Sequence, residues 1–226
     1  MSTAASKAFK TELQYGDGAT PELFLTVAEL KTIEPAEAVA KTTEVTSHDS
    51  TKAEFISTYV DEGEISAGGN WTGGATQTAQ VTALGGLRGN WLMCFPDWGQ
   101  ATQAFTAAAS DICTAVGHLL KTGQPVRVSS SGAPEDLPDP LVSGTTYYVH
   151  WLDADTFTLH TTNAGAVANT GVVNITDAGT GTHTIRKGTR LSMAALVTSV
   201  KLGAPLDGAQ SVDMKIKITG DTTWAT

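Results

Sequence analysis

The feature that most constrains the fold lies near the end of the chain, where apolar and charged residues alternate. Over residues 212–218 every second position is apolar, and Asp213, Lys215 and Lys217 occupy the positions between. Side chains of a β-strand point alternately to opposite faces, so this pattern predicts a strand with one buried and one solvated face. Asp207-Gly208 predicts a turn before it.

The composition also favours a β-rich protein with many turns. Only 16% of the 226 residues are charged, and 23 are glycine. Hydrophobic residues make up 41%, which is enough for a buried core and argues against disorder. The net charge of −9 argues against a protein that holds nucleic acid, because such proteins need basic patches.

Few features of the chain suggest export or a membrane location. Cys94 and Cys113 are too few for a disulfide framework, and both are expected to be buried, reduced thiols. The first residues lack the apolar region of a signal peptide, and no apolar run approaches the roughly 20 residues of a membrane span. We expect the protein to be made in the cytosol and to leave it only as part of something larger.

Residues 104–186 differ in their pattern of residue types from the rest of the chain. Short runs rich in β-branched and aromatic residues alternate there with clusters of Gly, Asp and Ser. Regular short strands separated by such turns are typical of a small sandwich or barrel. The expected strands cover residues 126–128, 147–151, 157–159 and 172–175.

One short helix is expected in the first part of the chain. Thr51 and Glu54 have the spacing of a capping box, in which a hydroxyl and a carboxylate satisfy early backbone donors. The next apolar residues would share one helical face, and Gly63 would end the helix. These apolar residues are Phe55, Ile56, Tyr59 and Val60.

Other segments of the first part predict strands and loops. Apolar residues favour strands over residues 24–33, 64–71 and 91–95. Residues 72–86 are rich in Gly and Thr, as expected for a long loop that could contact another copy. Residues 34–45 fit either an edge strand or a loop.

Motifs for catalysis or for metal binding are weak throughout. Residues 47–50 contain Ser, His and Asp, but adjacent residues cannot supply the geometry of a catalytic triad. Asp153 and Asp155 lack the remaining ligands of a calcium loop and fit a β-turn better. The five histidines lack the close pairing of a metal site. We expect no enzymatic activity, no metal and no cofactor.

Five motifs, taken in order, resemble the major tail tube protein of siphophages, the bacterial viruses with long non-contractile tails. Each is weak alone, and the shared order makes the likeness specific. They are GDG at 16–18, TSHDS at 46–50, DEGEIS at 61–66, APLDG at 204–208 and KITG with a later Trp at 217–224. The resemblance covers residues 1–103 and 187–226, and residues 104–186 resemble a small β-module of virion proteins spliced into that family.

The resemblance implies a mainly β fold. It implies a tail-tube β-sandwich or partial barrel with one short flanking α-helix, and a small inserted β-sandwich-like domain facing outward. Six copies would form a ring, and rings would stack into a tube located in the virion tail after assembly in the host cytoplasm. The implied partners are other copies, the tape measure protein, and the tail terminator and tip proteins. DNA would pass through without specific binding, and no membrane partner is implied.

Charged residues near two predicted strands are the candidate lumen or ring-interface residues. Asp61, Glu62 and Glu64 lie at the entry to the strand over 64–71, where acidic groups facing a lumen would repel DNA phosphates. Lys215 and Lys217 form a basic stripe on the final strand. Either they lie on a solvated face or they bind an acidic neighbouring subunit.

Two alternative functions are left open by the sequence. One is a tube protein of a secretion machine, which would share the architecture. The other is a carbohydrate- or surface-binding adhesin, with Tyr147, Tyr148 and Trp151 as an aromatic platform. Alternation along the strand favours core packing for Tyr147 and Trp151.

Overall fold

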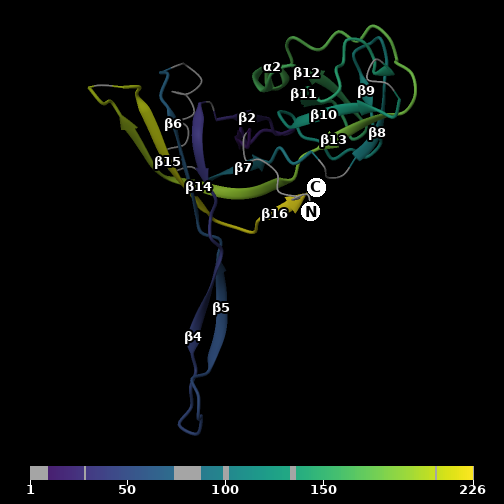
Figure 1. Ribbon diagram of the computed structural model, residues 1–226. Coiled ribbons are helices and arrows are strands. Elements are labelled where there is room, and N and C mark those ends of the chain that lie inside the picture. The colour runs from purple at the N-terminus through teal and green to yellow at the C-terminus, as the bar shows by residue number, and fades with distance from the viewer. Residues whose placement is uncertain are drawn as a thin grey trace, which may run out of the picture. The chain divides into compact units, whose positions relative to one another are not determined.

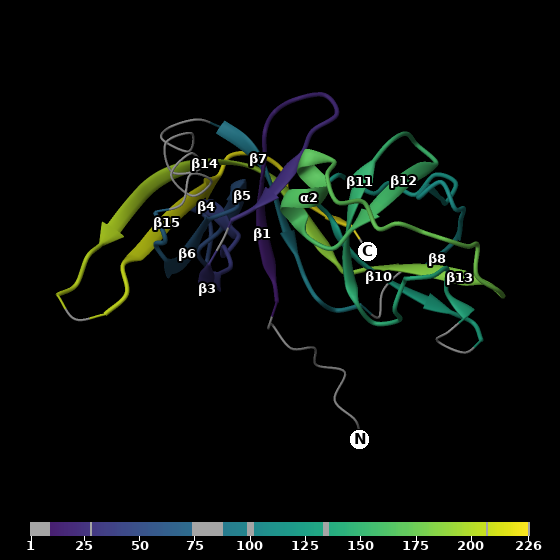
Figure 2. The same cartoon turned by 90° about the horizontal axis from the view of Figure 1, so that it is seen from above.

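The structure is a computed structural model that describes residues 10–27, 29–73, 88–98, 102–132, 136–206 and 208–225. The chain divides into two compact units (Figures 1 and 2). Unit 1 comprises Met1–Val27, Gly89–Ser192 and Thr223–Thr226, and unit 2 comprises Ala28–Arg88 and Met193–Thr222. Strands dominate both units, so the mainly β fold expected from the sequence is confirmed.

Unit 1 contains a small antiparallel sheet built on β1 (Glu12–Gly16). This strand pairs with β2 (Phe24–Thr26) on one side and with β7 (Arg88–Cys94) on the other. Its buried side chains include Leu13, Phe24, Trp91 and Leu92, and the ring centroids of Tyr15 and Trp91 lie 5.0 Å apart. β16 (Thr223–Ala225) pairs with residues 190–192 at the start of β14 (Arg190–Gly203).

The rest of unit 1 is a closed six-stranded barrel. Its order around the wall is β10-β11-β12-β9-β8-β13, and Figure 2 shows β8, β13 and β10 side by side. The strands are β8 (Thr102–Ala107), β9 (Cys113–Thr114), β10 (Pro125–Ser130), β11 (Thr146–Trp151), β12 (Thr156–His160) and β13 (His183–Lys187). The core of the barrel consists mostly of inward-facing aliphatic and aromatic side chains such as Val126, Val149 and Ile185.

Three of the four strands expected in this region are confirmed, and one is wrong. β10, β11 and β12 cover the expected positions, whereas residues 172–175 form only an isolated bridge between Val172 and His160. Val173 and Ile175 are buried as a strand pattern suggests. However, the backbone N–H of Ile175 donates to the side chain of Asp111, so this donor is not available to a ladder.

A short helix, α2 (Asn163–Ala168), follows β12 in the barrel unit. Thr162 caps its start by accepting a hydrogen bond from the N–H of Gly165, and Asn169 ends it in the left-handed region. Among the described residues, α2 is the one segment that forms an α-helix. The sequence predicted a helix at a different position. The helix predicted from the capping box at Thr51 up to Gly63 is wrong, because β5 (Phe55–Asp61) pairs there with β4 (Val39–Glu44).

Unit 2 consists of a sheet and this β4–β5 pair. The sheet runs in the order β14-β15-β6-β3, with β3 (Leu30–Glu34), β6 (Glu64–Asn70) and β15 (Ser211–Ile218). The apolar positions of β15 are buried and Asp213 and Lys215 are exposed, so the alternation predicted from the sequence is confirmed. The strand predicted over 24–33 is divided between the units, because Glu29 adopts a left-handed backbone conformation between β2 and β3.

The remaining expectations concern two strands, a loop, a turn and the two cysteines. The expected strand over 64–71 corresponds to β6, and that over 91–95 corresponds to β7. The expected loop over 72–86 lies largely outside the described residues, as does Asp207 of the expected turn.

Cys94 and Cys113 are buried free thiols, and burial raises the pKa of each to about 12. No helix in the described ranges is long and apolar enough to cross a membrane.

Two phenylalanines provide a matched test of where the core lies. Phe157 in the barrel is fully buried, whereas Phe55 of β5 is 60% exposed. We expect Phe157→Ala to lower the free energy of unfolding by about 3–5 kcal/mol, through lost burial and a residual cavity. Phe55→Ala should change it by less than about 0.5 kcal/mol. Chemical denaturation of the full chain measures both, and equal losses would contradict the assigned core.

A candidate subunit interface in unit 2

The β4–β5 pair forms a two-stranded ribbon that Figure 1 shows extending beyond the other strands of unit 2. Its register runs from Val39 opposite Asp61 to Glu44 opposite Phe55. Every residue of the two strands is exposed except Asp61 at the base, which is half-buried. The hydrogen bonds of the ladder are therefore open to water along the whole ribbon.

Apolar side chains occupy both faces of this ribbon. A β-bulge at Thr58 makes Lys41 pair with Tyr59 and Thr42 pair with Ser57. Cross-strand partners share a face, so the bulge places Phe55 and Val60 on one face and Ile56 and Tyr59 on the other. Tyr59 is the most exposed of these, at 64%. Sequence reasoning noticed these four residues but assigned them to one helical face.

The three candidate acids lie where the ribbon joins the sheet. β5 ends at Asp61 and β6 begins at Glu64, with Gly63 between them at a φ of 82°. A side chain at position 63 would be strained, and its Cβ would lie 2.5 Å from the carbonyl oxygen of Glu37. Glycine is therefore required for the turn that brings the acids beside β15.

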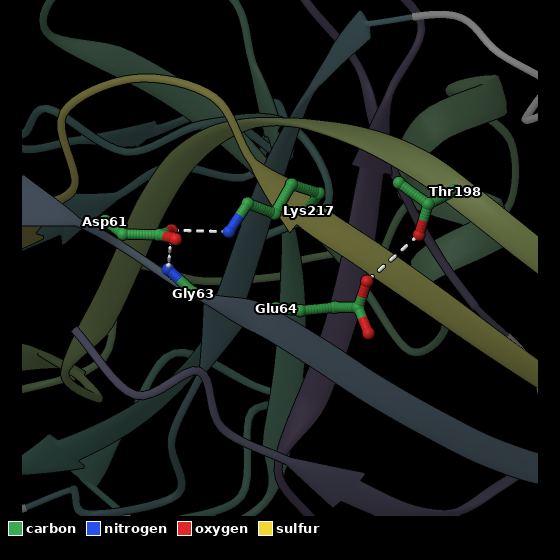
Figure 3. Close-up of polar contacts among 5 residues, drawn as sticks. All are labelled: Asp61, Gly63, Glu64, Thr198 and Lys217. Carbon is green, nitrogen blue, oxygen red and sulfur yellow. Dashed lines mark hydrogen bonds and ion pairs between the residues drawn. The ribbon is translucent and has the colours of Figure 1, made fainter. Parts of the chain in front are cut away.

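Two of the acids form ion pairs with the candidate lysines of β15. Figure 3 shows the Asp61–Lys217 pair and the contact between Glu64 and Thr198. Lys217 binds the carboxylate of Asp61, which also accepts a hydrogen bond from the N–H of Gly63 at 3.0 Å. Lys215 Nζ lies 3.2 Å from Glu64 Oε1, and Thr198 donates its hydroxyl to the other oxygen of Glu64 at 3.1 Å. The register of β15 on β6, with Lys217 opposite Glu64, brings these groups together.

These contacts change the acidity of both carboxyl groups. The hydrogen bond from Lys217 lowers the pKa of Asp61, with a smaller contribution from the N–H of Gly63. The hydrogen bond from Lys215 likewise lowers the pKa of Glu64 against the opposing effect of desolvation. Both groups carry a negative charge at neutral pH. Because the pairs are solvent-accessible, they position the ribbon base more than they stabilise the fold.

Glu62 differs from its two acidic neighbours. Glu62 Oε2 accepts a hydrogen bond from the hydroxyl of Thr222 at 3.3 Å, and neither ion pair of the described residues includes Glu62. The structure thus brings all five candidate residues to one corner of unit 2. Four of them form two pairs within the chain, and the charge of Glu62 has no basic partner in the described part of the chain.

The other candidate sites take simple structural roles. Tyr147 is only 4% exposed and Tyr148 donates its hydroxyl to Glu12, so they do not form an exposed platform with Trp151. Asp153 accepts the N–H groups of Asp155 and Thr156, which confirms the expected turn. No group of three or more His, Cys, Asp or Glu suited to a metal ion occurs within the described ranges.

Comparison with known proteins leaves the family of this chain open. No family model and no curated protein matches it. Among solved structures, it is similar to a chain in the tail of an empty gene transfer agent particle with C6 symmetry, at 12% identity and a TM-score of 0.47, covering 98% of this chain and 100% of that one. A chain in the virion of a native gene transfer agent particle gives 11% identity and a TM-score of 0.47, covering 98% and 100%. A chain of the six-fold symmetrised anti-feeding prophage baseplate gives 6% identity and a TM-score of 0.43, covering 100% and 97%.

The ion pair at the ribbon base predicts a specific titration. Lys217→Gln should raise the pKa of Asp61 toward its ordinary value of 3.8, because it removes the main stabilising contact of the carboxylate. The control Lys201→Gln removes an equal charge from an exposed position of β14 and should leave that pKa unchanged. The carboxyl ¹³C signal of Asp61, followed from pH 2 to 6, measures both.

The sign of the pH effect follows from the lowered pKa. The unfolded chain binds the proton more readily, so the pair contributes stability above the ordinary pKa and loses it as the pH falls through the folded value. Identical Asp61 titrations in the wild type and Lys217→Gln would contradict the assigned ion pair.

Proposed function

We propose that this protein is a structural subunit of a bacteriophage tail tube, in which copies of the chain form rings, of six copies by resemblance, that stack around a central channel. The order of its sequence motifs supports the tail tube family. The observation that carries the proposal is the β4–β5 ribbon, with exposed apolar side chains on both faces.

The ribbon needs a partner for physical reasons. An isolated two-stranded hairpin is marginally stable in water, because it has no third element against which to bury a face. Fully burying a large apolar side chain contributes about 1.5–3 kcal/mol, and this ribbon holds four that are more than half exposed. Covering both faces at once requires an interface that wraps around the ribbon.

A second copy of the same chain is the occupant that best fits this surface. If the ribbon of one copy binds a different surface of the next copy, the contact is head-to-tail. Copies joined by such contacts form closed rings or open filaments. β3 is the outer strand of the unit 2 sheet, and pairing across subunits would also remove such an edge. Both features suit a subunit that covers its ribbon and its sheet edge by assembling with other copies.

We propose the barrel as the inserted, outward-facing module. The suggested insert, residues 104–186, nearly coincides with the strands β8 to β13. Thr102 at the start of β8 pairs with Arg186 at the end of β13, so the chain enters and leaves the barrel at adjacent points. A module with neighbouring ends can be spliced into a host fold without separating the strands that flank it.

Charge supports a channel that passes DNA without binding it. The chain carries −9 overall, and an acidic lumen would repel phosphate. Glu62 is the best candidate among the five residues, because its carboxylate has no basic partner within the described residues. The tape measure protein would occupy the same channel before infection, with the tail terminator and tip proteins at the two ends.

The two alternative functions, a secretion-machine tube and an adhesin, are not equally well supported. A secretion-machine tube would use the same ribbon and remains the second candidate. The adhesin proposal depended on an aromatic platform, and burial of Tyr147 removes its main support. No enzymatic role is proposed.

A double substitution tests the ribbon directly. Phe55→Ser with Tyr59→Ser removes one aromatic side chain from each face, so we expect rings and tubes to be lost while the monomer stays folded. Both side chains are already exposed, so the free energy of unfolding should change by less than about 1 kcal/mol in total. Electron microscopy and sedimentation velocity measure assembly, and thermal unfolding checks the fold.

The matched control changes polar positions of the same ribbon. Ser57→Ala with Thr43→Ser leaves the apolar side chains in place and should assemble like the wild type. Tubes of wild-type length and abundance in the Phe55/Tyr59 variant would refute the ribbon as the subunit contact.

A further inference from the structure

Three basic side chains lie near one another in unit 1. They are Lys121, Lys187 at the end of β13, and Arg190 at the start of β14. Burial lowers the pKa of each, and the charge of Arg190 lowers the pKa of both lysines further. Arg190 therefore repels both lysines in a partly desolvated setting.

The hydrogen-bond partners of the guanidinium are neutral. Arg190 donates from Nη1 to the side-chain oxygen of Gln124 at 2.7 Å, and both Nη atoms donate to the carbonyl of Leu119 at 3.3 Å. Its Nε is buried and has no partner among the described residues. A buried donor without an acceptor lowers stability. The guanidinium of Arg190 therefore lacks one acceptor.

Lys187 is likewise paired with a neutral oxygen. Its Nζ donates to the carbonyl of His118 at 3.0 Å. An ammonium has three donors, so this contact leaves two for another acceptor. The two ion pairs found in the described part of the chain both lie in unit 2, at Lys215 and Lys217.

A small cavity lies between Lys187 and Arg190. Its volume is about 50 Å³, and it is bounded by Leu119, Gln124, Lys187, Gly188, Arg190 and Ala225. Among the described residues, this lining contains two cations and no carboxylate. A guanidinium and an ammonium on one small cavity match the charge and the acceptor geometry of an oxyanion.

We propose that Lys187 and Arg190 form a binding site for one oxyanion group, either the carboxylate of an acidic side chain from another copy or a free phosphate. The anion would neutralise the repulsion between the two cations and accept the remaining N–H donors. Leu119 at the rim is 76% exposed, which leaves the entrance accessible to a protein partner.

Inorganic phosphate is the probe, titrated into the full chain at constant ionic strength with chloride as the reference anion. At ten times its dissociation constant, phosphate should raise the unfolding midpoint of unit 1 by roughly 5 °C relative to chloride. Arg190→Gln and Lys187→Gln should each abolish this shift. Lys201→Gln, which removes one positive charge from unit 2, should retain it.

The two variants protect the test against misfolding. If Arg190→Gln does not fold, Lys187→Gln decides, because its ammonium makes a single hydrogen bond to a carbonyl. A wild type that responds to phosphate no more than to chloride overturns the proposal. Equal phosphate shifts in the wild type and Lys187→Gln also overturn it.

A second arm identifies the source of the oxyanion, and this arm rests on the proposed function. If a carboxylate from another copy fills the site, the phosphate shift should disappear in assembled protein, and Lys187→Gln should weaken assembly. If a free anion fills it, the shift should persist after assembly and Lys187→Gln should assemble normally. Failure to form tubes would refute the proposed function but leave the phosphate titration of the free chain unaffected.

Discussion

The β4–β5 ribbon exposes apolar side chains to water on both of its faces, and a partner surface is needed to cover them. A sheet normally buries one face against a core, and the main sheet of unit 2 does so through the alternating side chains of β15. No such layer covers the ribbon in the described part of the chain, and four apolar side chains of β5 stay more than half exposed, namely Phe55, Ile56, Tyr59 and Val60. A chain that keeps such a surface is adapted to a partner that covers it.

The residues at the ribbon base give that surface a defined position. Gly63 permits a tight turn that only glycine accommodates, and the lysines of β15 bind Asp61 and Glu64 on either side of it. These contacts are too exposed to contribute much to folding. Their effect is to fix where the ribbon leaves the sheet, so that a long arm can meet its partner with little loss of conformational entropy.

Sequence patterns predicted the elements whose environment is simple and missed those whose environment is unusual. The final strand was evident because one face is buried and the other solvated, and three barrel strands followed from runs bounded by turn residues. β5 was mistaken for a helix because the bulge at Thr58 shifts its alternation, so that Phe55, Ile56, Tyr59 and Val60 imitate helical spacing. Its content of Ile, Thr, Tyr and Val favours a strand. The grouping of five charged residues was foreseeable, but their pairing within one chain depends on a register that spacing does not specify.

Hydrogen–deuterium exchange of the ribbon amides, compared between free and assembled protein, measures whether assembly covers the ribbon. In the free chain the exposed ladder between Val39 and Asp61 should exchange rapidly, because it has no covering layer. Assembly should slow this exchange by roughly a hundredfold or more, corresponding to about 2.7 kcal/mol or more of added protection. Ribbon amides that exchange equally fast in assembled tubes would contradict the account, because the apolar surface would then be uncovered in the state that it is proposed to build.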